Sequence, residues 1–203
     1  PVLAAEGAEF TVINGWERAE YFKPTPDFEV THGFHFDEAF EVVAGEVAAV
    51  QNAVGLAEVN GFNRIEIAGP DAHAFLDHVI CGRVTKKAGR GGLGYLLNDH
   101  GWVKAEATVA NIPGGPIWYG SAAASEWHDM DWLKAHADGF DMSLRSLTND
   151  HTILVLAGPK ARDVLSAVSR AGSAASAFPW LSVPRAYIRI APAGVMAVSF
   201  SGD

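Results

Sequence analysis

The sequence has one cysteine, little positive charge and no long apolar run, and each scarcity excludes a class of protein. The single cysteine, Cys81, allows neither a disulfide framework nor a cysteine-rich metal site within the 203 residues. It follows an apolar run, so we expect it to be packed rather than reactive. No stretch of about 18 apolar residues occurs, and we expect no transmembrane helix and no membrane partner. The first residues lack the basic start and apolar core of a signal peptide, so the expected location is cytoplasmic.

The shortage of positive charge argues against a polyanionic partner. The chain has 15 lysines and arginines against 24 aspartates and glutamates, which gives a formal net charge of -9. A protein this acidic does not hold a phosphate backbone by general electrostatics, so nucleic acid is not expected as a partner. A small anionic ligand stays compatible with this charge, because a local basic pocket can exist on an acidic protein.

Common catalytic motifs are also missing. The eight histidines form neither a His-Glu-x-x-His motif nor an i, i+4 pair, and we expect no metal site. The glycines of 89–94 match neither a Walker A loop nor a dinucleotide fingerprint, and they fit the entry to a strand better than a phosphate loop. Ser199 to Gly202 lacks the frame of a nucleophile elbow. The sequence therefore shows no catalytic consensus of these kinds.

The strongest internal pattern is a repeated strand-turn-helix unit. Residues 64–79 resemble residues 153–168, and both copies contain an Ala-Gly-Pro turn. Glycine permits the tight turn after the strand, and proline suits the first position of the helix that follows. Chance similarity between two common turns is the alternative. The repeat predicts an α+β protein with a first half at 54–140 and a second half at 141–203.

The remaining segments predict the elements around this repeat. Residues 1–53 are expected to form an irregular, aromatic-rich segment over 1–36 that wraps a larger body, followed by a helix over 37–53. Between the copies we expect three strands and one helix, and after the second copy a β-rich stretch. Their predicted ranges are 92–97, 103–112, 117–122, 125–136 and 183–200.

Glu106 is the carboxylate of greatest interest. In the predicted strand 103–112, alternation places Lys104, Glu106 and Thr108 on one face. A carboxylate that projects from a sheet into a cavity can hydrogen-bond or exchange a proton with a nitrogen heterocycle. The alternative is that Lys104 and Glu106 form an ordinary solvated face.

Several motifs in a fixed order resemble a known family. They are Gly-Trp-Glu-Arg at 15–18, Val-Gly-Leu at 54–56, Ile-Glu-Ile-Ala-Gly-Pro at 65–70, and the stretch from Leu97 to Val109. Together they resemble the glycine-cleavage T-protein (aminomethyltransferase) family, and most closely the folate-binding portion of dimethylglycine and sarcosine dehydrogenase-like proteins. The resemblance is collinear and spans nearly the whole chain.

This resemblance implies a fold, a cofactor and a reaction. The fold is the aminomethyltransferase (T-protein) folate-binding fold with duplicated strand-turn-helix units, and the cofactor is tetrahydrofolate in a central cavity. The reaction is one-carbon transfer, as in demethylation of an N-methylated glycine such as dimethylglycine, so a small methylated amine donor is an expected partner. FAD is expected only in a separate oxidase domain or subunit. Residues 199–203 look like the start of a further family motif, so we expect the C-terminal part of the fold to be missing.

The resemblance also implies site residues. Glu106 is the predicted catalytic residue, and the predicted cofactor-binding residues are Leu93, Tyr95, Asn98, Ser121 and Phe200. The family places an aspartate beside the folate nitrogens where this chain has Ala105, with Glu106 one residue later. This departure leaves open a folate-binding regulatory or structural module without turnover.

Overall fold

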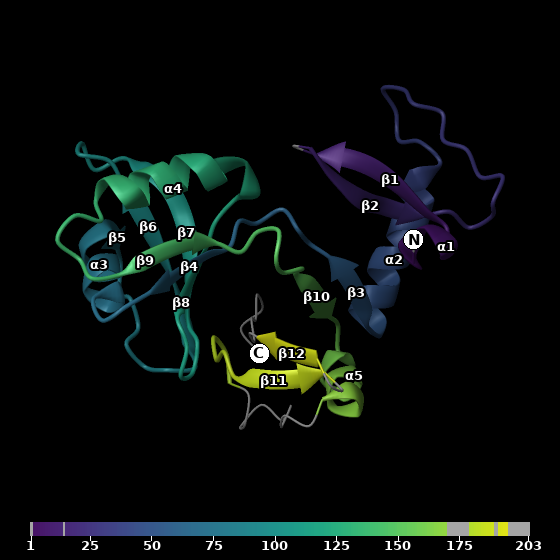
Figure 1. Ribbon diagram of the computed structural model, residues 1–203. Helices are drawn as coiled ribbons and strands as arrows, with labels where there is room; N and C mark the ends of the chain where they lie inside the picture. The colour runs from purple at the N-terminus through teal and green to yellow at the C-terminus, as the bar shows by residue number, and fades with distance from the viewer. Residues whose placement is uncertain (1, 14, 170–178, 189–190, 195–203) are drawn as a thin grey trace. The chain divides into compact units, whose positions relative to one another are not determined.

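The computed structural model describes residues 2–13, 15–169, 179–188 and 191–194, and from residue 185 onward it describes the backbone only (Figure 1). Contacts between Cα atoms divide the chain into two compact units. The first unit contains Pro1–Asn60 and Thr152–Arg162, and the second contains Gly61–His151 and Asp163–Asp203.

The first unit begins with a hairpin that the sequence-based prediction missed. Helix α1 (Val2–Ala5) precedes strands β1 (Ala8–Ile13) and β2 (Trp16–Phe22), which pair antiparallel. The prediction of an irregular segment is therefore wrong for most of residues 1–22. The missed signal is the Asn-Gly pair at 14 and 15, because this dipeptide is strongly favoured in two-residue hairpin loops. Gly15 has the positive φ, +83°, that such a loop requires.

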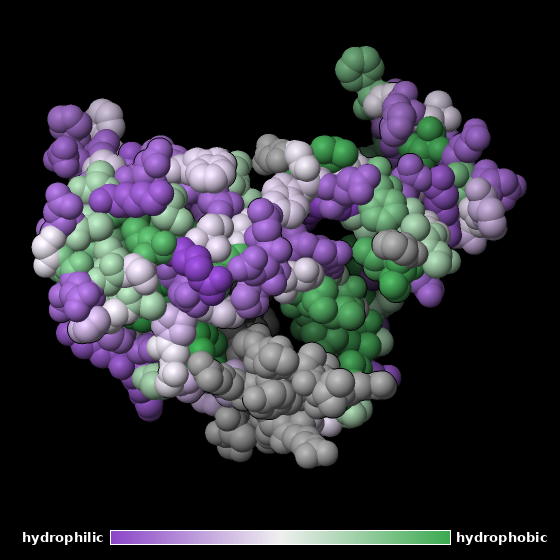
Figure 2. All heavy atoms as spheres, viewed as in Figure 1, coloured by the Kyte–Doolittle hydropathy of each residue, from purple (hydrophilic) through white to green (hydrophobic). Residues whose placement is uncertain are grey.

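The rest of the first unit joins a helix to a two-stranded sheet. Helix α2 (Ala39–Asn52) confirms the helix predicted over 37–53, and β3 (Gly55–Glu58) pairs antiparallel with β10 (Leu154–Ala157). Tyr21 is the only buried side chain among the described residues of this unit. Figure 2 shows apolar residues gathered over β3 and β10, where Leu56 and Leu154 are exposed. Little apolar surface is buried here, so hydrophobic burial contributes little to the stability of this unit by itself.

The second unit is built on a six-stranded antiparallel sheet with the strand order β5-β6-β7-β8-β4-β9. The strands are β4 (Ile65–Ala68), β5 (Ile80–Cys81), β6 (Arg90–Leu97), β7 (Val103–Asn111), β8 (Ile117–Gly120) and β9 (Ser143–Ser146). The helices are α3 (Ala72–Val79), the 3-10 helix η1 (Ala123–Ser125) and α4 (Glu126–Ala135). These elements confirm the strands and the helix predicted between the two repeat copies.

One face of this sheet carries the core of the second unit. Side chains of β4, β6, β7 and β8 pack with those of α3 and α4 in one hydrophobic cluster. Its least exposed members are Ile65, Ile67, Phe75, Leu76, Leu96, Ala107, Tyr119 and Leu133. The opposite face presents Leu93, Tyr95 and Glu106, which are exposed. The sheet is therefore buried on one face and open on the other, as antiparallel sheets commonly are.

The second repeat copy and the last strands complete the described chain. Helix α5 (Ala161–Val168) crosses the boundary between the two units, and β11 (Arg185–Ile188) pairs antiparallel with β12 (Ala191–Gly194). Both predicted strand-turn-helix copies are present, as β4 with α3 and as β10 with α5.

The two units do not follow the predicted ranges 54–140 and 141–203. Strand β9 pairs with β4 across the boundary at 140, and β10 pairs with β3 in the same way. Each unit therefore combines segments from both ranges, because sheet pairing joins segments that are distant in the chain.

The turn of each repeat copy needs glycine for a steric reason. Gly69 has φ +140°, and a Cβ there would lie 2.5 Å from the carbonyl oxygen of Asp141. Gly158 has φ +111°, and a Cβ would lie 2.5 Å from the carbonyl oxygen of Val50. The repeated glycine thus permits both an unusual backbone angle and a close approach of another backbone segment.

We predict that Gly69→Ala destabilises the protein more than Gly101→Ala does. Gly101 also has a positive φ, +79°, but a Cβ at this position would meet no atom within 4 Å. Backbone strain alone should cost about 1–2 kcal/mol at Gly101, and the clash with Asp141 should add about 1–3 kcal/mol at Gly69. Urea unfolding of both variants measures the difference, and equal losses would show that the close approach at Gly69 is unimportant.

Candidate functional site

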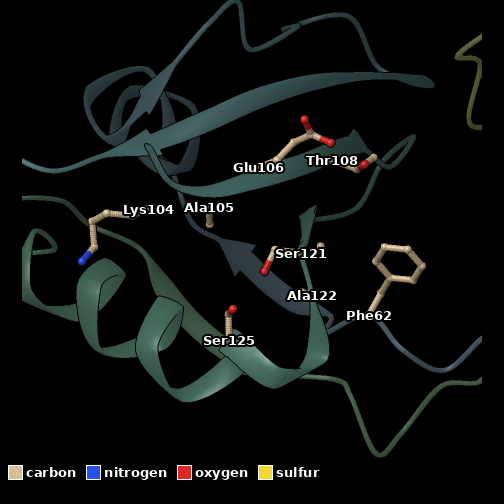
Figure 3. Close-up of a pocket in the computed structure, with 9 residues that line it drawn as sticks. Phe62, Lys104, Ala105, Glu106, Thr108, Ser121, Ala122 and Ser125 are labelled. Carbon is tan, nitrogen blue, oxygen red and sulfur yellow. The ribbon is translucent and has the colours of Figure 1, made fainter. Parts of the chain in front are cut away.

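A cavity of about 360 Å³ opens in the second unit where β7 extends past the end of β8 (Figure 3). Thr108 is the last residue of β7 in this direction to pair with β8, opposite Gly120. Beyond that pair, Phe62 forms an isolated bridge with Ala122 and closes one side. The lining residues are Phe62, Lys104, Ala105, Glu106, Thr108, Gly120, Ser121, Ala122 and Ser125. The volume lies within the range of about 300–1,000 Å³ that is typical of small-molecule sites.

A buried polar network borders this cavity. The carboxylate of Asp129 is fully buried and accepts hydrogen bonds from the Tyr119 hydroxyl at 2.9 Å and from the Ser121 hydroxyl. The side-chain amide of Asn63 donates to Ser121 Oγ at 2.8 Å, and its oxygen accepts the Ser121 backbone N–H at 2.9 Å. A buried carboxylate is stable only with such donors, so the network holds β8, α4 and the segment before β4 in one arrangement.

Tyr119 remains a hydrogen-bond donor in this network. Burial, and then the negative charge of Asp129, raises the pKa of the Tyr119 hydroxyl well above its ordinary value. The phenol therefore stays protonated across the physiological range and keeps its hydrogen on the carboxylate.

Three of the predicted site residues lie together on the open face of the sheet. Tyr95 of β6 stands directly opposite Glu106 of β7, and Leu93 stands opposite Thr108. Hydrogen bonding with Glu106, and then the charge of its carboxylate, raises the pKa of the Tyr95 hydroxyl. Tyr95 and Glu106 thus form a cross-strand polar pair beside the cavity, and Glu106 also lines it.

The other predicted residues have different positions. Ser121 lines the cavity with its hydroxyl bound to Asp129. Asn98 lies in the turn between β6 and β7, where its side-chain oxygen accepts the backbone N–H groups of His100 and Trp102 at 3.0 and 2.9 Å. Asn98 is not among the residues that line the cavity, and Phe200 lies outside the described residues.

The expected common face for Lys104 and Glu106 is wrong. The register between β6 and β7 shifts after the pair Leu96 and Ala105, because the next pair is Leu97 and Val103. Lys104 is the extra residue of this bulge, and a bulge changes the direction of the side chain it carries. Figure 3 shows Lys104 directed toward α4, away from Glu106.

Sequence reasoning missed Asn63, Tyr119 and Asp129. A usable signal existed for Asp129, because it lies on the same buried face of α4 as Met130 and Leu133. A charged residue on the apolar stripe of a helix is a candidate for a buried network. Asn63 and Tyr119 carry no comparable pattern in the sequence.

Comparison with known proteins identifies the fold and then the family. The glycine cleavage system aminomethyltransferase T from Bartonella henselae superposes with a TM-score of 0.71 at 21% identity, covering 90% of this chain and 45% of that chain. Heterotetrameric sarcosine oxidase from Corynebacterium sp. U-96 in complex with pyrrole 2-carboxylate superposes with a TM-score of 0.58 at 16% identity, covering 83% of this chain and 84% of that chain. The chain therefore has the aminomethyltransferase T-protein fold, as the sequence motifs indicate.

The family follows from sequence. The pattern that defines the family described as "GCVT N-terminal domain" matches residues 1–203. Mitochondrial dimethylglycine dehydrogenase of Rattus norvegicus is 30% identical over 192 residues, which make up 93% of this chain and 22% of that protein. The chain belongs to the GCVT family, a family of folate-dependent aminomethyl transfer. It spans about a fifth of the length of this relative.

Two kinds of feature are absent from the described residues. Among the described residues, no group of three or more histidine, cysteine, aspartate or glutamate side chains could hold a metal ion. None of the described helices combines the length and the apolar character needed to cross a bilayer.

We predict that removal of the Asp129 carboxylate is much more destabilising than removal of its exposed neighbour. Asp129→Ala leaves the hydroxyls of Tyr119 and Ser121 without their acceptor, which should cost about 3 kcal/mol. Asp131→Ala on the solvent side of α4 should change stability by less than about 0.5 kcal/mol. Urea denaturation measures both, and similar losses would contradict the importance of the network.

We predict that Glu106→Gln lowers the pKa of Tyr95. A negative charge opposite Tyr95 disfavours the tyrosinate, so its removal should return the pKa toward the ordinary value of 10.0. Spectrophotometric titration of tyrosinate measures this change, with Tyr95→Phe to assign the titrating group. Asp99→Asn, an exposed carboxylate in the neighbouring turn, serves as the control. An unchanged Tyr95 titration in Glu106→Gln would show that the two side chains are not coupled.

Proposed function

We propose that this chain supplies the folate-binding site of an enzyme that transfers a one-carbon unit to tetrahydrofolate from an N-methylated glycine such as dimethylglycine. The observation that carries the proposal is the position of Glu106, a carboxylate that lines a ligand-sized cavity in a protein with the T-protein fold. The similarity to a dimethylglycine dehydrogenase favours this donor over other methylated amines.

The lining residues fit the ring system of tetrahydrofolate. A pterin ring carries adjacent N–H donors, and a carboxylate accepts two hydrogen bonds side by side, so Glu106 is suited to this edge. Phe62 is 48% exposed and offers an aromatic face to a flat ring at the other side of the cavity. Tetrahydrofolate, when bound, supplies the nitrogen that accepts the one-carbon unit.

The lining of the cavity supports Glu106 as the residue that handles protons. The family aspartate corresponds to Ala105, but here Ala105 packs against the hydrophobic cluster while Glu106 is exposed on the opposite face. Ala105 and Glu106 both line the cavity, so the carboxylate on this part of the wall is at position 106 rather than at position 105. Tyr95 stands opposite that residue on the neighbouring strand, and the Glu106 carboxylate can accept a proton from a ligand N–H within hydrogen-bond reach. A fixed carboxylate also orients the ligand relative to the donor carbon.

The donor must be oxidised before the transfer. The N-methyl group loses two electrons and a proton to become an iminium or formaldehyde-level carbon that a folate nitrogen can bond. We propose that an FAD-containing oxidase domain or subunit accepts these electrons. The relatives support this division, since one is named a dehydrogenase and another a heterotetrameric oxidase. A cytoplasmic location is part of the same proposal and is tested by cell fractionation.

A folate-binding regulatory or structural module without turnover is the second candidate. The observation that favours it is Ala105 in place of the family aspartate. The two candidates share folate binding and differ only in turnover with a methylated donor.

We predict that Glu106→Gln weakens tetrahydrofolate binding by at least about tenfold. Loss of hydrogen bonds to a charged carboxylate is worth about 1.5–3 kcal/mol, and about 1.4 kcal/mol corresponds to a tenfold change in Kd. Titration of the protein with tetrahydrofolate, followed by ligand fluorescence, measures the effect, and Asp99→Asn should bind as the unaltered protein does.

Three outcomes separate the candidates. Tight binding with dimethylglycine-dependent transfer supports the enzyme, and tight binding without transfer supports the module. No binding at about millimolar ligand, which corresponds to a binding free energy of about -4 kcal/mol, rejects both.

A further inference from the structure

Lys104 enters the cavity wall because of the β-bulge in β7. The extra residue interrupts the alternation of the strand, so that Lys104 does not share the direction of Glu106 (Figure 3). Among the described residues that line the cavity, Lys104 carries the positive charge and Glu106 the negative charge. The cavity is therefore polarised, with an ammonium group and a carboxylate that point in opposite directions.

The ammonium group of Lys104 is held by two side chains of α4. Its Nζ lies 2.9 Å from Nε2 of His128 and 4.4 Å from the centre of the Trp132 ring. An ammonium over an indole face is attracted by the negative face of the ring. Lysine has a long side chain with many rotamers, and these two contacts hold its end beside α4, at the edge of the cavity that Lys104 lines.

The buried network favours the tautomer of His128 in which Nε2 accepts a hydrogen bond from Lys104. Nδ1 of His128 lies 3.4 Å from Oδ1 of Asp129, which is a hydrogen-bond acceptor. A proton on Nδ1 faces that carboxylate and leaves Nε2 as the acceptor for the ammonium. Asp129 thus orients His128, and His128 in turn orients Lys104.

The ammonium group of Lys104 can accept a further partner, such as an anionic ligand group. An ammonium group has three donors, and His128 occupies one of them. Ser125, which also lines the cavity, makes no capping hydrogen bond with its side chain, and Figure 3 shows its hydroxyl pointing into the cavity below Lys104. The negative charge of Asp129 competes little with a ligand, because Asp129 is fully buried and already accepts from Tyr119 and Ser121.

We propose that Lys104 is a carboxylate-binding residue of this cavity, held in place by His128 and Trp132. The proposal rests on the proposed function, which brings two carboxylates to the site. One is the carboxylate of the iminium that oxidation of the N-methylated glycine leaves, and the other is the glutamyl carboxylate of tetrahydrofolate.

The test compares Lys104→Met with Lys134→Met in the complete protein. Methionine keeps the length of the side chain and its contact with Trp132 but removes the charge, and Lys134 is an exposed lysine of α4. Affinity for tetrahydrofolate and for tetrahydropterin, which lacks the glutamyl group, is measured together with the rate constant for transfer of the dimethylglycine methyl carbon to folate. Loss of a charged hydrogen bond should change the affected constant by about tenfold or more in Lys104→Met alone.

The constant that changes identifies the carboxylate. A lowered rate constant for transfer to folate, with unchanged folate affinity, assigns Lys104 to the donor. Weaker folate binding with unchanged tetrahydropterin binding assigns it to the glutamyl group. Unchanged constants, or equal changes in Lys134→Met, overturn the proposal.

A third measurement keeps this proposal separate from the proposed function. The melting temperature of the protein is measured with and without millimolar dimethylglycine, a readout that needs neither folate nor turnover. If the protein binds no folate, a rise in melting temperature that is lost in Lys104→Met still supports carboxylate binding by Lys104. The absence of any such rise in that case overturns it.

Discussion

The buried carboxylate of Asp129 is the interaction on which the candidate site depends. A charge without solvent contact must be matched by donors, and here the donors come from β8 and from the segment before β4. Their separation in sequence is large, since Asn63 and Asp129 are 66 residues apart. The network therefore fixes the end of β8, where Ser121 lines the cavity, and connects outward through His128. The position of Ser121 on the cavity wall follows from satisfying this one charge.

The β-bulge in β7 is the second constraint, because it gives Lys104 a different direction from Glu106. On one side of the bulge, Ala105 packs against the hydrophobic cluster and Glu106 faces the open side of the sheet. At the bulge itself, Lys104 turns toward α4. A regular strand with the same residues would place Lys104 and Glu106 side by side as an ordinary ion pair, and the cavity would lose its polarity.

Much of the fold could be predicted from the sequence, because local patterns determine it. The Ala-Gly-Pro turns at 68–70 and 157–159 identify both strand-turn-helix copies, and apolar spacing identifies α2 and α3. The order of the family motifs identifies the T-protein fold. The hairpin of β1 and β2 was also predictable in principle from its Asn-Gly loop, but the prolines and aromatic residues that follow obscure it. Strand pairing between β3 and β10 could not be predicted, because it depends on residues nearly a hundred positions apart.

The site was predictable only where a residue belongs to a family motif or a regular strand. Alternation places Glu106 and Thr108 on one face of β7 correctly, whereas a single inserted residue moves Lys104 away from them. The central claim is that the one-carbon unit of an N-methylated glycine reaches folate at this site. Its most direct test uses dimethylglycine with carbon-13 in its methyl groups, incubated with the complete protein and tetrahydrofolate and followed by NMR. The account predicts that the label appears as a folate-bound methylene carbon. Release of the label solely as free formaldehyde, at a rate that does not depend on folate, would contradict it.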